Sequence, residues 1–467
     1  MKIKLEPQRR CRERISRVKP WALGGASIQI DPLFPYYADR SADSIAEELE
    51  LAGYRTVRYF VVDERKINGP LIEACQRRGI AVWAMVLGNG SFGTAQLPPG
   101  WESWKMELLK ETKDGFQRLS HFAEEYVAWK SRRTGELVAR YPFDGIEVAE
   151  PYFPEWKGLR TGTYGDLSRH AAEAFRKRCG APLPEFRDRQ ADNYYRKVPE
   201  LYQEWVEMRV DAVNELVHRI INGPEGARSM RPDLLAATWS LAVTGRHAQA
   251  RLREWQGMDA ASMIAKVQPD MHVLQTHWPD WQRRWLRPDY VKHYRKLAAP
   301  IQRISPDLPI AIQADIGSSR RMVKSGTWLQ KFARSVQVQG FNGWTAYEYH
   351  IGGYMYDEPP FLLTARRIGE EELVLSFSKR IAPVKEPASL NLLITGFDQG
   401  SPQKIEAAAV RTDGNRLLLR IPGLPAGPLG IQLEGITDTP ELWLFKDRRA
   451  HHTPGDRVVP VKEPVEE

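Results

Sequence analysis

Residues 143–156 read FDGIEVAEPYFPEW, and this stretch predicts a buried strand that ends in acidic side chains. The apolar residues at positions 143, 146 and 148 are typical of a strand in the core of a sheet. Glu147 and Glu150 place carboxyl groups where a purely structural strand would carry Val or Ile. Pro151 ends the strand because it has no N–H to donate. The alternative is a strand end whose acids are only solvated or salt-bridged.

Short β-like runs alternate with helical patterns from Trp21 onward, which is typical of parallel βα units. Besides the stretch above, the predicted strands are residues 26–31, 56–62, 80–87, 234–241, 271–278, 310–316 and 341–350. Helices are expected between them, and a last helix at about 360–368. Eight such units predict a closed (β/α)8 TIM barrel. An open doubly wound sheet is the alternative, although no glycine-rich dinucleotide-binding turn follows the first strand.

The pattern changes near Glu370, where short strands separated by turn signals such as Asp413-Gly414 run from Leu373 to Phe445. They predict a small all-β sandwich, whose last strand is expected at Glu441–Phe445. The predicted organisation is a basic N-terminal segment, a barrel, a β-sandwich and a disordered tail rich in Pro and charge, at residues 1–20, 21–368, 371–450 and 451–467 respectively.

Part of the sandwich has a recognisable pattern. Residues 373–384 read LVLSFSKRIAPV, and residues 405–438 read IEAAAVRTDGNRLLLRIPGLPAGPLGIQLEGITD. This sequence resembles the S-layer-type bacterial immunoglobulin-like modules, in which the opening, the DGN hairpin and the ending recur. The resemblance implies an appended support or binding module and carries no prediction of a reaction.

The distribution of charge argues against a nucleic-acid partner. The chain has 467 residues and a formal charge of +8, but the first twenty residues contain eight Lys or Arg and two Glu, so that +6 lies there and +2 remains elsewhere. The rest shows no basic stripe and no nucleic-acid-binding motif. No window approaches 18 uncharged apolar residues, so no membrane span is expected.

The N-terminus is basic but lacks the apolar run of a secretory signal, so a cytoplasmic location is expected. Cys11, Cys75 and Cys179 are scattered and lack metal-type spacing, which is consistent with free thiols in a reducing compartment. We predict neither a resident metal nor a cofactor, and the composition carries no prediction of oligomeric state.

In a (β/α)8 barrel the active site lies at the carboxyl ends of the strands. These ends are acidic and aromatic here, a combination that suits a carbohydrate because rings cover the C–H face of a sugar while polar groups bind its hydroxyls. Several of the aromatic residues are equally consistent with a barrel core. The residues expected to bind substrate are Gln29, Asp31, Asn89, Tyr152, Trp156, Trp239, His277, Trp278, Asp280, Gln313, Tyr347 and His350.

The sequence Ala149-Glu150-Pro151 is similar to the Asn-Glu-Pro that closes strand 4 in the clan of retaining (β/α)8 glycoside hydrolases, where that Glu is the acid/base. Two positions depart from the pattern. Ala149 replaces the Asn that contacts the sugar 2-hydroxyl, and Asp315 stands at the end of strand 7, where the clan carries a Glu nucleophile. As a whole, residues 20–360 resemble uncharacterised bacterial barrels of the glycoside hydrolase type.

The first hypothesis is therefore glycoside hydrolysis with Glu150 as general acid and Asp315 or Glu348 as nucleophile or base. Asp315 is preferred because the Ile residues at 310, 312 and 316 share one parity, which directs Asp315 into the barrel. Strand 8 lacks such alternation. Glu147 is the reserve acid and is expected one layer below Glu150, as a buried support.

Two other functions remain open. A divalent-metal-dependent sugar isomerase or epimerase would use Glu150, His277 and Glu348 as ligands, although strand 5 ends in Trp239-Ser240 and lacks the expected acid. For His277, a hydrogen-bonded pocket histidine is the simpler interpretation. A barrel that only binds carbohydrate would show affinity for sugars without turnover.

Overall fold

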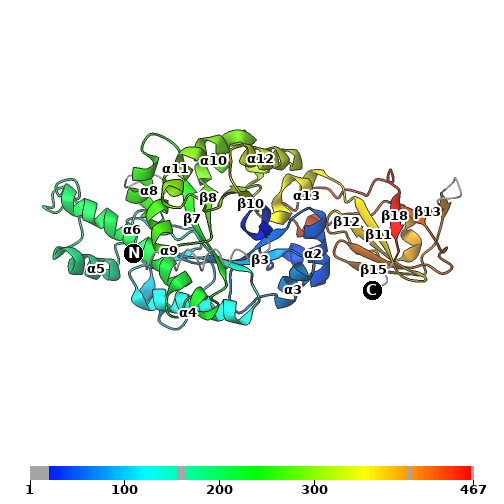
Figure 1. Cartoon of the computed structure of the whole chain (residues 1–467), viewed down its shortest axis with the longest axis horizontal. Helices are drawn as coiled ribbons and strands as arrows, with labels where there is room; N and C mark the ends of the chain where they lie inside the picture. The colour runs from blue at the N-terminus through cyan, green and yellow to red at the C-terminus, as the bar shows by residue number, and fades with distance from the viewer. Residues whose placement is uncertain (1–19, 155–158, 160–162, 397–401, 464–467) are drawn as a thin grey trace.

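The computed structural model describes residues 20–154, 159, 163–396 and 402–463, and its centre is a closed barrel of eight parallel strands (Figure 1). The strands follow the order β1-β10-β9-β8-β7-β6-β3-β2 around the barrel. They are β1 Gly25–Ile30, β2 Thr56–Val61, β3 Ala81–Leu87, β6 Gly145–Ala149, β7 Leu235–Ala242, β8 Met271–Thr276, β9 Ile310–Asp315 and β10 Gly343–Tyr347. The predicted (β/α)8 fold is confirmed, and the open doubly wound sheet is wrong.

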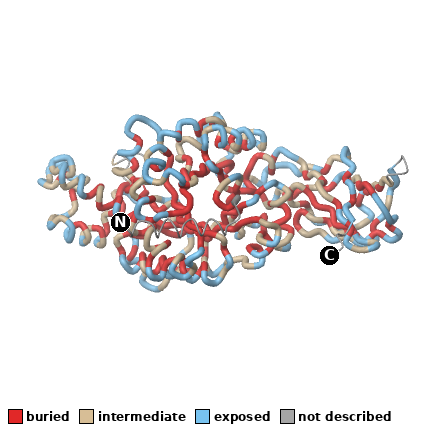
Figure 2. Tube along the Cα trace, in the orientation of Figure 1, coloured by how far each residue is buried: buried red, intermediate tan, exposed pale blue. Residues whose placement is uncertain are grey.

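Helices surround the barrel, so the strands are buried while the outer helical faces are exposed (Figure 2). The helices are α2 Ala42–Leu51, α3 Gly69–Arg77, α4 Glu124–Arg140, α5 Arg169–Cys179, α6 Pro199–Asn222, α7 Ala227–Met230, α8 Ala248–Gln256, α9 Ala260–Val267, α10 Trp278–Trp281, α11 Arg295–Ile304, α12 Gly326–Val338 and α13 Gly353–Asp357. Side chains of Ser41, Asn68 and Ser325 cap three of them by accepting backbone N–H bonds. None of the helices in the described ranges is both long and apolar enough to cross a membrane.

The barrel interior is filled by side chains and has an ion pair at its centre. Trp83, Met85 and Trp239 belong to its apolar cluster. The Arg58 guanidinium lies 2.9 Å from a carboxylate oxygen of Glu147 and 4.6 Å from the Trp83 ring centroid. Because side chains fill the interior of the barrel, a substrate can bind only at the ends of the barrel.

A second body follows the barrel as a curled, mostly antiparallel sheet of eight strands. The strands are β11 Leu362–Gly369, β12 Glu372–Phe377, β13 Asn391–Gly396, β14 Gln403–Lys404, β15 Ala409–Asp413, β16 Arg416–Arg420, β17 Leu429–Glu434 and β18 Val459–Lys462. Strand β18 pairs with both β11 and β17, so it joins the two halves of the sheet. Leu375 and Leu417 from one half share an apolar core with Leu392 and Ile431 from the other. This arrangement is consistent with the predicted β-sandwich.

Three local predictions in this region are wrong. Residues 362–369 form strand β11 and not a helix, because their backbone groups pair with both β12 and β18. Residues 441–445 contain no strand. The tail is ordered as far as residue 463, since β18 is part of the sheet and Thr453 Oγ1 donates to the carbonyl of Pro360 at 2.7 Å.

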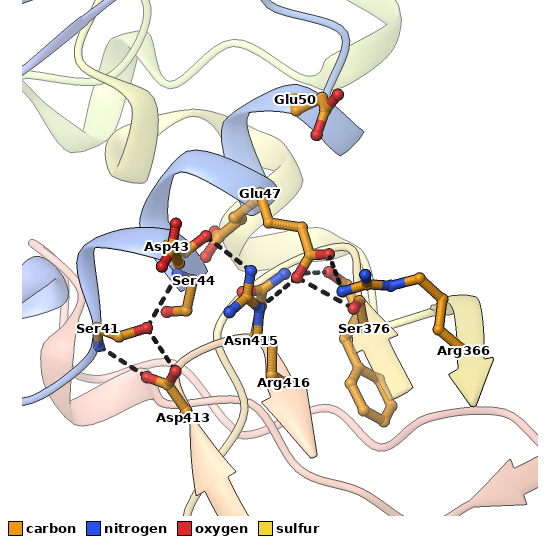
Figure 3. Close-up of polar contacts among 12 residues, drawn as sticks. Ser41, Asp43, Ser44, Glu47, Glu50, Arg366, Ser376, Asp413, Asn415 and Arg416 are labelled. Carbon is orange, nitrogen blue, oxygen red and sulfur yellow. Dashed lines mark hydrogen bonds and ion pairs between the residues drawn. The ribbon is translucent and has the colours of Figure 1, made fainter. Parts of the chain in front are cut away.

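Polar contacts attach the sheet to the barrel through helix α2 (Figure 3). Asp413 accepts hydrogen bonds from the backbone N–H and the hydroxyl of Ser41 at 2.7 and 2.5 Å. The buried carboxylate of Glu47 accepts from Ser376 Oγ at 3.1 Å and from the guanidinium of Arg416. These contacts hold the second body against the side of the barrel.

Candidate active site

Glu150 stands directly after β6, at the carboxyl end of the barrel, in an uncommon backbone conformation. Its φ of +49° lies in the left-handed region, which a residue with a side chain adopts at an energetic cost and which is often associated with functional sites. The backbone at Gly88 packs against the backbone at Pro151, and a Cβ at Gly88 would lie only 2.9 Å from the Pro151 Cα. A side chain larger than that of glycine would not fit there. The turn therefore determines the position of the Glu150 carboxyl group.

The Glu150 carboxyl group is held by an amide and lies in a low-polarity environment. Gln275 Nε2 donates to Glu150 Oε1 at 3.0 Å, and the Tyr152 hydroxyl donates to Gln275 Oε1 at 3.1 Å. Burial raises the pKa of Glu150 above its ordinary value, whereas hydrogen bonds from Gln275 and Tyr152 and the charge of Arg118 lower it in part. A half-buried carboxyl group with a raised pKa keeps its proton to a higher pH than an exposed one, which suits a general acid.

Asp315 is the last residue of β9 and points toward the same end of the barrel, as the alternation of Ile310 and Ile312 predicts. Its Oδ1 accepts the backbone N–H groups of Gly317 and Ser318 at 3.0 and 2.9 Å, and its Oδ2 accepts the Ser318 hydroxyl. Burial raises the pKa of Asp315, and these hydrogen bonds and Lys324 counter the increase. The carboxylate is thus positioned by its own turn.

Glu348 is fully buried beyond the end of β10, and its carboxylate already has several partners. Oε2 accepts the Asp31 backbone N–H at 2.6 Å, and Oε1 accepts the Tyr37 hydroxyl at 2.6 Å and the His350 backbone N–H at 3.1 Å. The His350 Nδ1 lies 2.8 Å from the same Oε1. Glu348 therefore ties β10 to the loop after β1.

The half-buried Asp31 side chain follows β1 and is next to this network. Burial raises its pKa from 3.8 to about 6, the nearby charge of Glu348 adds to the increase, and the Leu33 N–H and His350 act in the opposite direction. Its Oδ1 accepts the Leu33 N–H at 3.0 Å. Asp31 is thus a third carboxyl group with a raised pKa at this end of the barrel.

The pKa of the Tyr347 phenol responds to acids from four strand ends. Burial is the main cause of its raised phenol pKa, and the charges of Glu348, Asp315, Asp31 and Glu150 all contribute. Tyr347 is also the register partner of Asp315 on the neighbouring strand β9. The four acids stand at or directly after the carboxyl ends of β1, β6, β9 and β10, so they belong to the same end of the barrel.

Glu147 and Trp239 lie deeper, inside the barrel, as buried partners of one another. Trp239 Nε1 donates to Glu147 Oε2 at 3.0 Å, and Arg58 pairs with the same oxygen. This geometry gives Glu147 the supporting place expected for it. The Trp239 indole serves that carboxylate, so it does not offer a face to a sugar.

The remaining expected residues take different positions. Gln29 and Gln313 are buried in the barrel, and Asn89 Nδ2 donates to the Tyr152 carbonyl at 2.9 Å, which supports the turn after Glu150. His277, Trp278 and Asp280 lie half-buried after β8. Burial lowers the pKa of His277 to about 4, and Asp280 is 3.1 Å from Arg283. Trp156 lies outside the described residues.

Three residues at the site were not among the expected substrate-binding residues. Gln275, which holds Glu150, could have been found by alternation along β8, where Met271 and Val273 point inward. Arg118, in the two-residue strand β5, and Lys324, in the loop before α12, are the cations that act on Glu150 and Asp315, and no motif marks either of them. Only the folded chain reveals their proximity.

The metal-ligand set of an isomerase is not assembled. Across the ranges that the structure describes, no group of three or more His, Cys, Asp or Glu side chains could hold a metal ion. Glu348 is instead occupied by Asp31, Tyr37 and His350. The arrangement therefore suits acid/base chemistry by side chains better than metal chemistry at the three considered positions.

Comparison with protein-family models and with curated protein sequences finds no match. Among solved structures, the PgaB (BpsB) glycoside hydrolase domain from Bordetella bronchiseptica is similar with a TM-score of 0.51 at 16% identity, covering 69% of this chain and 93% of that chain. Gan42B, a GH42 β-galactosidase from G. stearothermophilus, has a TM-score of 0.50 at 12% identity, covering 70% and 51% of the two chains. At these identities the likeness establishes the fold, a barrel of the kind present in these glycoside hydrolases.

Proposed function

We propose that the protein hydrolyses a glycosidic bond, with Glu150 as the general acid and Asp315 as its carboxylate partner. The observation that carries the proposal is the position of Glu150: a half-buried acid with a raised pKa, held by Gln275 in a left-handed turn, next to the Tyr347 phenol that also faces Asp315. Glycoside hydrolysis needs one protonated and one ionised carboxyl group at the cleaved bond.

Burial raises the pKa of both carboxyl groups, but their other contacts differ, and this difference supports different roles for them. The described contacts of Glu150 are one amide hydrogen bond and a tyrosine, so its proton can be transferred to a leaving oxygen. Asp315 accepts three hydrogen bonds and lies near Lys324, and these interactions favour its ionised form. Glu348, with its four acceptor contacts, keeps the neighbouring strands in place.

For the second body we propose the role of a supporting module of the immunoglobulin-like type. The contacts of Asp413 and Glu47 with Ser41 and Arg416 fix it to the barrel near helix α2. The carboxyl groups of the site come from β1, β6, β9 and β10 and the turns after them, none of which belongs to this body.

The test is hydrolysis of oligosaccharides by the full chain. Glucan, mannan, xylan, galactan and chitin oligomers are incubated with the wild type, and the products are separated by chromatography. On any oligomer that is cleaved, Glu150→Gln and Asp315→Asn are each expected to lose at least about 10²-fold in turnover. Glu73→Gln, which changes an exposed carboxyl group on helix α3, away from the strand ends, is the matched control and retains activity. Normal turnover in both site variants contradicts the proposal.

A further inference from the structure

Among the residues whose burial is described, the exposed aromatic side chains lie at one end of the barrel. In the part of the chain whose burial is described, the large hydrophobic side chains that are exposed include two aromatic ones, Phe92 at 58% and Trp285 at 82%. Phe92 lies in the loop after β3 and Trp285 in the loop after β8. We call the loops that leave the carboxyl ends of the strands the carboxyl rim; Phe92 and Trp285 both belong to it.

Phe92 is held in place by a small hairpin that leads to Glu150. Strand β4 (Gly90–Ser91) pairs with β5 (Gln117–Arg118), and a Cβ at Gly90 would lie 2.0 Å from the Gln117 carbonyl oxygen. The Phe92 and Phe116 ring centroids are 4.8 Å apart, and the Arg118 guanidinium lies 5.4 Å from the Phe116 centroid. Arg118 is the cation that lowers the pKa of Glu150. Asn89, which precedes this hairpin, donates to the Tyr152 carbonyl, so the hairpin is linked to the turn that follows Glu150.

Trp285 is exposed although the backbone on both sides of it is anchored. Lys324 Nζ donates to the Arg283 carbonyl at 3.3 Å, and Trp328 Nε1 donates to the Leu286 carbonyl at 2.8 Å. Lys324 is also the cation that acts on Asp315. The Trp285 ring is therefore held out from a fixed segment next to the second proposed carboxylate.

The two aromatic positions lie on different sides of the barrel mouth. In the closed strand order, β3 and β8 are separated by β6 and β7, and Glu150 follows β6. A chain that contacts both Phe92 and Trp285 must pass over the strand ends between them. A single sugar bound at Glu150 would leave at least one ring exposed.

We propose that the carboxyl rim binds an extended glycan chain, with Phe92 and Trp285 stacking on sugars on the two sides of the cleaved bond, so that cleavage is internal to the chain. This inference rests on the proposed glycosidase function and specifies its substrate as a polymer. Rings that are flat, exposed and held by a fixed backbone cover the C–H faces of sugars with little loss of conformational entropy on binding.

The test measures binding without turnover, in the Glu150→Gln background. Di- and hexasaccharides of the glucan, mannan, xylan, galactan and chitin series are titrated calorimetrically. At least one hexasaccharide is expected to bind more tightly than its disaccharide. Phe92→Ala and Trp285→Ala should each weaken hexasaccharide binding about tenfold, through the loss of one stacked ring face, and leave disaccharide binding little changed.

Val338→Ala is the matched control, because Val338 is 72% exposed at the end of α12, which leads to the amino end of β10. It should bind like the parent. Equal affinity for short and long chains, unchanged binding in both aromatic variants, or no binding in any series overturns the inference. Self-association that both alanine substitutions abolish, measured by sedimentation, would make the rings a protein contact and overturn it too.

The same titrations separate this inference from the proposed function. Ring-dependent binding of hexasaccharides by a protein that cleaves none of them supports the binding of an extended chain at the carboxyl rim and overturns both hydrolysis and internal cleavage. Cleavage that depends on Glu150 and Asp315 but is insensitive to Phe92 and Trp285 supports hydrolysis and overturns the binding of an extended chain through these rings.

Discussion

Substitution of Asp31 by Asn should stabilise the protein at neutral and alkaline pH and have little effect in acid. The half-buried Asp31 carboxyl group has its pKa raised from 3.8 to about 6, because burial and the charge of Glu348 disfavour its ionised form. Between these two values the folded state binds more protons than the unfolded state, so stability falls as the pH rises. The cost is fully present above pH 6 and disappears below 3.8. Asn carries no charge and can still accept the Leu33 N–H.

The shift sets the size of the effect. A change of about two pKa units corresponds to about 3 kcal/mol at most, and screening by the solvent that reaches this half-buried group reduces it to about 1.5–2.5 kcal/mol. The unfolding entropy is about 2 cal/mol/K per residue, and the change in Tm is the free-energy difference divided by the total for the barrel. The Tm of Asp31→Asn should therefore exceed that of the wild type by about 2–4 °C at pH 8.

Thermal unfolding of both proteins, followed by tryptophan fluorescence at pH 4 and pH 8, measures this difference. The comparison of the two proteins at each pH cancels the titration of all other groups. At pH 4 the difference should shrink to less than about 1 °C, because folded Asp31 is then protonated. A loss of stability at pH 8, or the same difference at both pH values, would refute the reasoning.

Three further outcomes are expected. Gln275→Met removes a hydrogen bond that favours ionised Glu150, so the alkaline limb of the kcat/KM profile should move up by about one pH unit; an unchanged limb would separate Gln275 from the acid. Arg58→Met leaves Glu147 buried without its cation and should destabilise the barrel by about 3–5 kcal/mol in chemical denaturation, whereas the double variant with Glu147→Met should recover most of the loss. Glu47→Ala should let the sheet unfold separately from the barrel, which calorimetry would show as two transitions in place of one.

The barrel could be predicted from the sequence because its strands alternate with helices over a long distance. Along Ile310–Asp315 the isoleucines face the helices, and this parity alone directs Asp315 to the site. The alternation of side chains did not predict the position of Glu348, because this residue lies beyond the end of β10 and its carboxylate accepts the Asp31 backbone N–H. The alternation also failed near residue 362, where a short apolar run suits a helix or a strand and tertiary pairing decides.

The candidate site was predictable only where a residue ends a strand. Glu150 and Asp315 were found in this way, but the left-handed turn at Glu150 has no glycine to signal it. Arg118 and Lys324 lie outside the barrel strands, and their effect on the two acids depends on the folded arrangement of segments that no motif marks. Local sequence patterns carry no information on that arrangement.

The pairing of Glu150 with Asp315 is tested most directly by the dependence of hydrolysis on the leaving group. Dinitrophenyl and methyl glycosides of the cleaved sugar differ in their need for a proton on the departing oxygen. Glu150→Gln should lose at least about 10²-fold in kcat/KM on the methyl glycoside and less than about tenfold on the dinitrophenyl glycoside, whereas Asp315→Asn should lose at least about 10²-fold on both. Equal losses on the two glycosides in Glu150→Gln, or wild-type rates in Asp315→Asn, would contradict the assignment.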